Sequence, residues 1–313
     1  MDLLTADKSP FLKLLLQKII VCDGGMGTEI QRRDPSMDDF EGCEGLNELL
    51  CVTRPDIIGE IHASYYQAGA DIVETNSFGS SSIVLDEFGR GDKSFEYSKA
   101  AAKLAKDIAN SFSTAAHPRF VSGSVGPSTK LPSLGHIGFD LMRNSYQTQI
   151  EGLVAGGVDL LQIETCQDPL QIKAAVQGAF DAFKKQGRRV PIFVQITVET
   201  VGTMLVGTDT AAALTVLESL PIEGVGMNCA TGPDLMKEHL KFLGTNSTRL
   251  VSCLPNAGLP RNVGGKAVYD LTPEQLTTSL KEFTEGFGLS LVGGCCGTTP
   301  AHIKHLAEVV STL

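Results

Sequence analysis

The sequence predicts a single α/β domain, residues 1–313, in which eight parallel strands close into a (β/α)₈ TIM barrel. Short apolar runs of strand length alternate with stretches of helical spacing along the whole chain. No linker, charge block or low-complexity segment divides the 313 residues, a length that suits one large barrel. An unbroken strand–helix series indicates a parallel sheet, and an open doubly wound sheet is the main alternative to a closed barrel.

The expected elements follow in chain order, after an amphipathic stretch at Pro10–Lys18. Strands are expected at Ile19–Asp23, Asp71–Thr75, Phe120–Val125, Leu160–Glu164, Ile192–Thr197, Gly224–Asn228, Leu250–Leu254 and Leu289–Val292. Helices are expected at Pro55–Ala68, about Ser94–Ser111, Leu141–Ala155, Pro169 to about Lys185, Thr210–Leu220, Asp234–Leu243, Pro273–Phe287 and Pro300–Leu313. The first of these helices repeats apolar residues on one face, and proline suits the first turn of those at Pro169 and Pro300. Gly264–Lys266 is expected to form the tip of a small excursion in the seventh loop.

Composition excludes several classes of protein. With 42% hydrophobic and 20% charged residues and a mean hydropathy of +0.06, the chain is globular. A net charge of −10 disfavours nucleic acid or an anionic membrane surface as a partner. The longest apolar runs have strand length, so no membrane span is expected. Residues Met1–Lys8 lack a basic start followed by an apolar region, which predicts a cytoplasmic protein whose eight cysteines stay reduced.

A barrel brings the C-terminal ends of its strands together at one rim, where the active sites of such folds lie. The residues expected there are Asp23, Glu74, Thr75, Asn76, Glu164, Thr165, Thr197, Asn228, Cys229, Pro255, Asn256, Cys295 and Cys296. Each one alone could be a helix cap or a loop residue. Their density at one kind of position indicates a functional site.

Adjacent cysteines follow the last strand, in Gly293-Gly294-Cys295-Cys296-Gly297. They could be zinc ligands, a redox pair or buried core residues, and burial alone does not explain the flanking glycines. Cys229 follows the sixth strand, which ends close to the eighth on the same rim. Three thiolates with one open position are typical of catalytic rather than structural zinc.

The other cysteines show no such pattern. Cys22 and Cys253 lie inside strands and are expected in the core, and Cys43 and Cys51 flank a loop without metal-ligand spacing. Cys166 lies nearer to the rim, just after the fourth strand, but is not selected as a ligand.

Zinc held by three cysteines favours alkylation of sulfur. It could bind an incoming thiol and hold it as a thiolate, whereas a free thiol with a pKa of about 8.5 is only slightly ionised at neutral pH. The same electron-rich zinc is a poor activator of water. Asp23 and Glu164 could hold a substrate ammonium group, and the N–H groups of Gly24 and Gly25 a carboxylate. Alternatively, Asp23 caps a turn and Glu164 pairs with a neighbouring cation.

These residues resemble the homocysteine S-methyltransferase family. Asn228-Cys229 with Gly293-Gly294-Cys295-Cys296-Gly297 carries the resemblance, which extends from Asp23-Gly24-Gly25-Met26-Gly27-Thr28 to the last helix. The branch most similar is the homocysteine-binding module of cobalamin-dependent methionine synthase. Stretches typical of that branch are Thr53–Asp56, Ala68–Asn76, Pro255–Gly258 and Gly297–Pro300.

The resemblance implies zinc on Cys229, Cys295 and Cys296, with the sulfur of homocysteine as the exchangeable fourth ligand. It implies that Asp23 and Glu164 contact the substrate amino group and that the amides of Gly24 and Gly25 meet its carboxylate. Thr75, Asn76 and Asn256 match positions close to the sulfur and the zinc. Asn256 is expected to be a possible stand-in ligand when homocysteine is absent.

The methyl donor implied by the resemblance is methylcobalamin. No general base other than the metal would be needed, because coordination to the metal removes the thiol proton. Members of this branch continue into folate-binding, cobalamin-binding and activation modules, so the chain is expected to be either a free-standing module that works with separate proteins or an excised piece. The alternative enzyme takes its methyl group from S-methylmethionine, S-adenosylmethionine or betaine. A structural or storage zinc protein without turnover is the alternative from another class.

Overall fold

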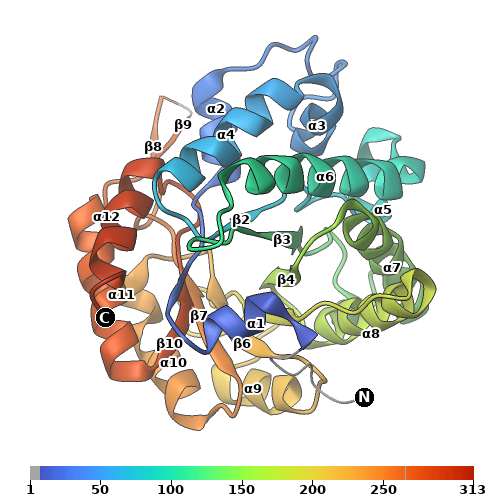
Figure 1. Ribbon diagram of the computed structural model, residues 1–313. Coiled ribbons are helices and arrows are strands. Elements are labelled where there is room, and N and C mark those ends of the chain that lie inside the picture. Colours follow the sequence, from blue (N-terminus) through green and yellow to red (C-terminus); the bar gives the residue numbers. More distant parts are fainter. Residues whose placement is uncertain (1–7, 265) are drawn as a thin grey trace.

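The computed structural model describes residues 8–264 and 266–313. Met1–Asp7, which form most of the segment behind the expectation of a cytoplasmic protein, lie outside the described residues, as does Gly265 at the expected loop tip. Within the described part, eight strands form one parallel sheet in the order β1-β10-β7-β6-β5-β4-β3-β2. The helices surround this sheet, which is nearly closed (Figure 1). The prediction of a single-domain (β/α)₈ barrel is confirmed.

The strands of the barrel are β1 (Ile20–Val21), β2 (Ile72–Glu74), β3 (Phe120–Val125), β4 (Leu160–Cys166), β5 (Ile192–Ile196), β6 (Gly224–Asn228), β7 (Leu250–Leu254) and β10 (Leu289–Val292). The α-helices are α1 (Pro10–Leu15), α2 (Met26–Arg33), α3 (Leu50–Thr53), α4 (Pro55–Gln67), α5 (Ser82–Leu85), α6 (Ser94–Phe112), α7 (Phe139–Gly156), α8 (Pro169–Gln186), α9 (Thr210–Glu218), α10 (Pro233–Asn246), α11 (Pro273–Phe287) and α12 (Pro300–Val310). Single turns of 3₁₀ helix cover Asn47–Leu49, Asp86–Phe88, Gly91–Lys93 and Pro132–Leu134. A separate antiparallel hairpin, β8 (Arg261–Val263) and β9 (Lys266–Val268), forms the excursion expected in the seventh loop.

The barrel closes where β1 meets β2. The N–H of Asp71, just before β2, donates to the carbonyl of Val21 at 2.7 Å, and the Asp71 carboxylate accepts the N–H of Val21 at 3.1 Å. The same carboxylate pairs with Lys18 at 2.6 Å. One acidic side chain therefore joins the first two strands and the segment that leads into them.

Side chains alternate between the inside of the barrel and the helices outside it. Nearest the N-terminal ends of the strands the inward layer is apolar, with Ile20, Ile72, Phe120, Leu160, Phe193 and Leu291. Helix α1 lies across this end (Figure 1) and adds Phe11, Leu12 and Leu15 to the same cluster. The ring of Phe11 meets those of Phe120 and Phe193 edge-on, at 5.6 and 6.1 Å. The stretch that the sequence showed only as amphipathic thus contains a helix that closes this end of the barrel.

The next inward layer is polar. It contains Cys22, Glu74, Ser122, Gln162, Gln195 and Ser252, all buried except for the half-buried Glu74. Gln195 donates to the Ser252 hydroxyl at 3.0 Å, and Gln162 donates to Glu74. Gly226 makes room for this contact, because an added Cβ would lie 2.1 Å from the Ser252 hydroxyl oxygen. The barrel therefore changes from apolar to polar towards the end where the predicted site residues lie.

The structure departs from the expected elements near the N-terminus. The glycine turn after β1 leads at once into α2, a helix that sequence reasoning missed because it is rich in charge and contains Gly27. It ends at Arg33, and the next residue, Asp34, has a left-handed backbone (φ 49°) before Pro35. Helix α1 covers Pro10–Leu15 of the amphipathic stretch Pro10–Lys18.

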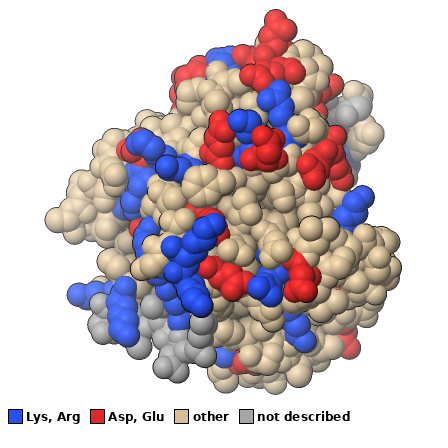
Figure 2. Space-filling view, turned by 90° about the vertical axis from the view of Figure 1, so that its right-hand side faces the viewer, with Lys and Arg blue, Asp and Glu red and all other residues tan. Residues whose placement is uncertain are grey.

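The charges do not form one continuous surface on the face shown in Figure 2, where acidic and basic side chains lie next to one another. No helix within residues 8–264 and 266–313 is both long and apolar enough to cross a membrane.

Candidate metal and substrate site

A cavity of about 460 Å³ opens at the C-terminal ends of the strands. Eight of the predicted site residues line it: Gly24, Gly25, Thr75, Asn76, Glu164, Cys229, Cys295 and Cys296. Glu74 and Thr165 lie in the same wall, and Met26, Phe78, Val84 and Phe88 give the cavity an apolar side. Residues far apart in the sequence therefore meet at the rim, as the barrel prediction requires.

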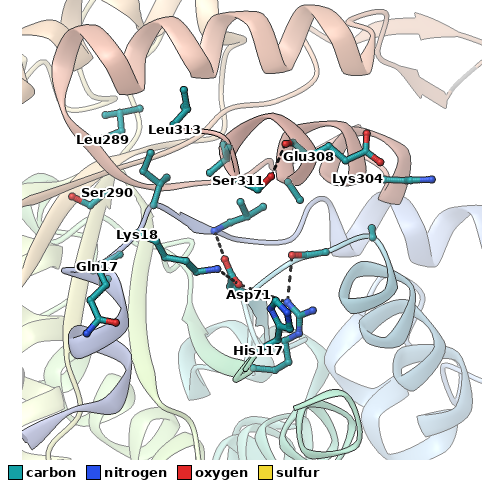
Figure 3. A pocket seen from close by; sticks show the side chains of 18 of the residues that line it. Gln17, Lys18, Asp71, His117, Leu289, Ser290, Lys304, Glu308, Ser311 and Leu313 are labelled. Atoms are coloured by element: carbon teal, nitrogen blue, oxygen red, sulfur yellow. Dashed lines mark hydrogen bonds and ion pairs between the residues drawn. The ribbon is translucent and has the colours of Figure 1, made fainter. Parts of the chain in front are cut away.

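A larger cavity, of about 850 Å³, lies at the opposite end of the barrel, between α1 and α12 (Figure 3). Its main charged groups are already paired, because Lys18 reaches Asp71 and Arg119 donates to the carbonyl of Ala70 at 2.7 Å. Barrels of this kind carry their chemistry at the other end. The smaller cavity is therefore the candidate site.

The three cysteines converge at one side of this cavity. Their sulfur atoms all lie within 4.8 Å of one another, and those of Cys295 and Cys296 are 4.0 Å apart. Tetrahedral zinc with Zn–S bonds of about 2.3 Å needs sulfurs about 3.8 Å apart. The three residues thus fit a zinc ion with only small side-chain adjustments, and the cavity leaves a fourth position accessible.

The three thiols differ in acidity. Hydrogen bonds from Cys229 and Cys295 lower the pKa of Cys296, whereas hydrogen bonds with Cys229 and Cys296 raise the pKa of Cys295. At Cys229 the lowering through Cys295 is outweighed by Cys296 and by burial, so its pKa rises. The contacts among the three sulfurs therefore favour the thiolate of Cys296 over those of Cys229 and Cys295, and a divalent cation bound to all three would favour the thiolate form of each.

Backbone contacts hold the cysteine loops in place. Cys229 and the next residue, Ala230, have left-handed backbones (φ 58° and 54°), a costly conformation that turns the chain back after β6. The N–H of Cys295 donates to the carbonyl of Pro255 at 2.8 Å, and that of Cys296 to the side-chain oxygen of Asn256 at 3.1 Å. Asn256 is buried and is absent from the cavity wall, so it orients a cysteine from behind.

The two glycines that follow β1, Gly24 and Gly25, have a packing role. A Cβ added to Gly25 would lie 2.8 Å from the carbonyl oxygen of Cys295, and one added to Gly24 would lie 2.9 Å from that of Thr298. The N–H of Gly25 donates to the same Thr298 carbonyl at 3.1 Å. The glycines therefore let the β1 loop and the β10 loop touch through their backbones, and the proton of Gly25 is used inside the protein.

Glu164 enters the cavity from the end of β4. Its two oxygens accept hydrogen bonds from Ser124 at 2.5 Å and from Asn228 at 2.8 Å. Asn228 also accepts the N–H of Thr165 at 2.7 Å, and Thr165 has a left-handed backbone (φ 52°). Burial raises the pKa of Glu164 to about 7. Asn228 thus connects β4 with β6 and fixes the carboxyl group of Glu164 near Cys229.

Asp23 lies behind the cavity wall and is 1% exposed. Its carboxylate accepts the N–H of Glu74 at 3.0 Å and the thiol of Cys22 at 3.4 Å. Burial raises the pKa of Asp23 to about 8. Glu74, which was not selected as a site residue, lies between Asp23 and the cavity.

Thr75 and Asn76 contribute to the β2 side of the cavity. The hydroxyl of Thr75 accepts the N–H of Ser124 at 3.0 Å, and the amide of Asn76 donates to the carbonyl of Asn47 at 2.7 Å. Both side chains therefore hold neighbouring loops together. Their direct contact with a substrate remains a prediction.

Nothing in the sequence indicated that Ser124 and Tyr269 belong to the site. Glu74 and Asn228 were expected at the rim because they end strands, but no role was assigned to either side chain, since no sequence signal distinguished them from helix caps. Tyr269 follows the β8–β9 hairpin, far from any motif, and its hydroxyl hydrogen-bonds to Cys296. Cys22, Cys51, Cys166 and Cys253 are buried and Cys43 is half-buried, and none of them joins the three-cysteine cluster.

Comparison with known proteins identifies the family. The model of the homocysteine S-methyltransferase family matches residues 20–310. The chain belongs to this family. Its membership, indicated above by the cysteine and glycine motifs, is thereby confirmed and places the chain among methyltransferases.

Relatives in this family include methionine synthases of Mycobacterium leprae and Mycobacterium tuberculosis. They are 47% and 46% identical to the chain over 300 and 302 residues, which is 96% of this chain but 25% of each relative. The chain thus spans about a quarter of their length. Among solved structures, the metallated form of the homocysteine methyltransferase MmuM from Escherichia coli shares the fold, with a TM-score of 0.77 and 23% identity over 96% of this chain and 100% of that one.

Proposed function

We propose that this chain transfers a methyl group to the sulfur of homocysteine, giving methionine, with a zinc ion held by Cys229, Cys295 and Cys296. The observation that carries the proposal is the convergence of three cysteine sulfurs within 4.8 Å beside a cavity that also exposes carboxyl groups. Zinc, when bound there, would take the substrate sulfur as its fourth ligand and lower the pKa of the thiol. A cytoplasmic location suits this role, because thiols stay reduced there.

The remaining parts of the substrate would be held by this chain's own groups. Carboxyl groups at the ends of β1, β2 and β4 would attract the ammonium group. The N-terminus of α2 lines the cavity with Met26 and Gly27 and has no side-chain cap, so its N–H groups and that of Gly24 are suited to a carboxylate. Because the two ends of an amino acid have opposite charges, this arrangement would orient homocysteine with its sulfur towards the cysteines.

The methyl donor we propose is methylcobalamin, held by another module or protein. The support is that the methionine synthase relatives are about four times as long as the matched region, which covers 25% of each. The thiolate of homocysteine would attack the methyl carbon in line, and the carbon–cobalt bond would break with both electrons left on cobalt. The chain would then act as the homocysteine-binding module of a larger assembly, whether in one polypeptide or in several.

A second donor class is favoured by the outer part of the cavity. Phe78 and Phe88 line it together with the exposed Glu87. Aromatic faces and carboxylates attract sulfonium and quaternary ammonium groups. S-methylmethionine, S-adenosylmethionine or betaine would then replace methylcobalamin while the cysteine cluster keeps its role.

An anaerobic absorbance assay tests the proposal. Zinc-loaded protein is mixed with methylcobalamin, and the spectrum is followed with and without homocysteine. Homocysteine-dependent formation of cob(I)alamin and methionine is the expected result. Methionine formed only from a sulfonium or betaine donor would instead select the second class. Failure with every donor, with zinc at one per chain and no change in metal coordination on adding homocysteine, would leave a structural or storage zinc protein.

A further inference from the structure

The segment that follows the β8–β9 hairpin reaches the cysteine cluster from outside the cavity. The hydroxyl of Tyr269 hydrogen-bonds to Cys296, and its ring packs on Gly297, where an added Cβ would lie 2.2 Å from it. The hairpin itself gives this tyrosine little support, because all of Arg261–Val263 in β8 is exposed. The position of Tyr269 therefore depends on how the chain just after it is held.

Leu271, two residues further on, is held through both of its backbone groups. Its N–H donates to the carbonyl of Ala257 at 3.1 Å, and the N–H of Ala257 donates to the carbonyl of Cys296 at 3.0 Å. The carbonyl of Leu271 lies 2.9 Å from Nε2 of His302, on α12. The segment that carries Tyr269 is thus fixed between the loop after β7 and the last helix.

The partners of His302 determine its tautomer. Nε2 must carry the proton, because the carbonyl of Leu271 can only accept. Nδ1 is then the acceptor, and it lies 3.1 Å from the backbone nitrogen of Thr299 and 2.9 Å from its hydroxyl, which completes the capping box of α12. The residue is only 7% exposed, and burial lowers the pKa of His302, which favours the neutral ring. One ring nitrogen therefore serves the helix and the other serves the segment with Tyr269.

A path of hydrogen bonds and backbone thus leads from α12 to a cysteine of the cluster. We propose that His302 is a positioning residue of the zinc site: its Nε2–H holds the carbonyl of Leu271, so that the hydroxyl of Tyr269 stays on the sulfur of Cys296. Partners of metal ligands orient them, and their loss weakens metal binding. The inference rests on the proposed function, because it requires zinc at the three cysteines.

Two substitutions separate the roles of the two ring nitrogens. His302→Gln keeps an acceptor and an N–H donor on adjacent atoms of one amide, and Gln275 caps α11 from the equivalent position, accepting the N–H of Thr272 at 2.9 Å. His302→Glu has the same shape and can also cap the helix, but it has no N–H for Leu271. Zinc affinity should be unchanged in His302→Gln and about threefold to tenfold weaker in His302→Glu. The negative charge that His302→Glu adds would by itself favour a divalent cation, so charge does not account for such a loss.

A double variant identifies the route of the effect. Zinc affinity is measured on the full chain by competition with a chelator. His302→Glu combined with Tyr269→Phe should bind zinc as weakly as Tyr269→Phe alone, because the histidine acts through that hydroxyl. Co²⁺ in place of zinc gives a second readout: its sulfur-to-metal charge-transfer band should shift alike in His302→Glu and Tyr269→Phe and stay in place in His302→Gln.

His305→Gln is the matched control, because His305 lies on the same helix and its Nδ1 has no partner among the described residues. It should change neither the affinity nor the band. If His302→Glu does not fold, His302→Asn replaces it, since its shorter amide keeps an acceptor for Thr299 and does not reach Leu271.

Unchanged zinc affinity in His302→Glu would overturn the role of His302, and so would losses that add up in the double variant. Equal losses in His302→Gln and His302→Glu would also reject it, because the N–H donated to Leu271 would then not matter. Absence of stoichiometric zinc from the unmodified chain would contradict the proposed function instead.

Discussion

The two ends of the barrel are built in opposite ways. At the N-terminal ends of the strands, α1 covers an apolar layer and the carboxylate of Asp71 is matched by Lys18 and by the N–H of Val21. At the C-terminal ends, none of the ion pairs within residues 8–264 and 266–313 includes Asp23, Glu74 or Glu164, and Cys229 has a left-handed backbone. The first end satisfies its own groups, whereas the second carries costs that a metal and a substrate would relieve.

The largest effect is expected where the cysteines meet. Cys296→Ser should abolish stoichiometric zinc binding and lower methyl transfer at least about a hundredfold, because a hydroxyl is a weak zinc ligand at neutral pH. Zinc content by atomic absorption and methionine formation are measured on the same sample. Cys43→Ser, at a half-buried cysteine outside the cluster, should keep both. Full activity in a zinc-free Cys296→Ser protein would refute the metal site.

Substitutions at the opposite end of the barrel should lower the free energy of unfolding and leave zinc and substrate binding unchanged. Phe11→Ala removes a fully buried ring from α1, the helix that closes this end, and should cost about 3–5 kcal/mol of unfolding free energy. Urea unfolding measures this, and zinc content and homocysteine affinity should not change. Leu16→Ala, at the exposed end of the same helix, is the control and should cost less than about 0.5 kcal/mol. A loss of homocysteine affinity in Phe11→Ala would show that the two ends are coupled.

Glu164 differs from Phe11, because burial of its carboxylate is unfavourable for folding when no ligand is bound. Its pKa is raised to about 7 from an ordinary value near 4.3, so its contribution to stability is complete below pH 4.3 and is lost as the pH rises through 7. In metal- and substrate-free protein this loss is about 3 kcal/mol by pH 8, and Glu164→Gln should lack it while binding homocysteine poorly.

Unfolding free energies at pH 5 and pH 8 measure the difference. Glu282→Gln, at an exposed carboxylate of α11, should follow the unmodified chain. The same pH dependence in Glu164→Gln as in the unmodified chain would mean that other groups at this end carry the cost.

Much of the active end could be predicted from the sequence. Apolar runs alternating with stretches of helical spacing were enough to predict the barrel. Because all its strands end on one rim, Cys229 was then expected near Cys295 and Cys296, although 65 residues lie between Cys229 and Cys295. That distance in sequence does not matter, because in a parallel barrel every strand ends on the same rim. The run of glycines and cysteines after the last strand also has few alternative functions.

Other features could not be predicted because they depend on which way a side chain or a loop turns. Asp23 and Glu74 are equivalent as strand-end acids, and only the fold shows that Asp23 binds the N–H of Glu74 and lies behind it. The left-handed backbones of Thr165 and Cys229 have no sequence signal, since neither residue is glycine. Helix α1 has the pattern of any amphipathic helix, and its position across the barrel follows from tertiary packing alone.

The smallest expected effects concern two tyrosines, one at each end of the barrel. The ring of Tyr269 packs on Gly297, where an added Cβ would lie 2.2 Å from it, and its hydroxyl hydrogen-bonds to Cys296. Tyr269→Phe should weaken zinc binding about tenfold, as loss of an outer-shell partner does. Zinc competition with a chelator measures this change.

Tyr66→Phe is the comparison for that experiment, because the hydroxyl of Tyr66 donates to the carbonyl of Phe120 at 2.7 Å, at the N-terminal end of β3. It should cost about 1 kcal/mol of unfolding free energy and leave zinc affinity unchanged. Equal zinc affinities in both variants would remove Tyr269 from the metal site, since a hydroxyl bonded to a ligand sulfur must change the charge on that sulfur. The two variants together test whether the hydroxyl of Tyr66 stabilises the fold at one end while the hydroxyl of Tyr269 supports the metal site at the other.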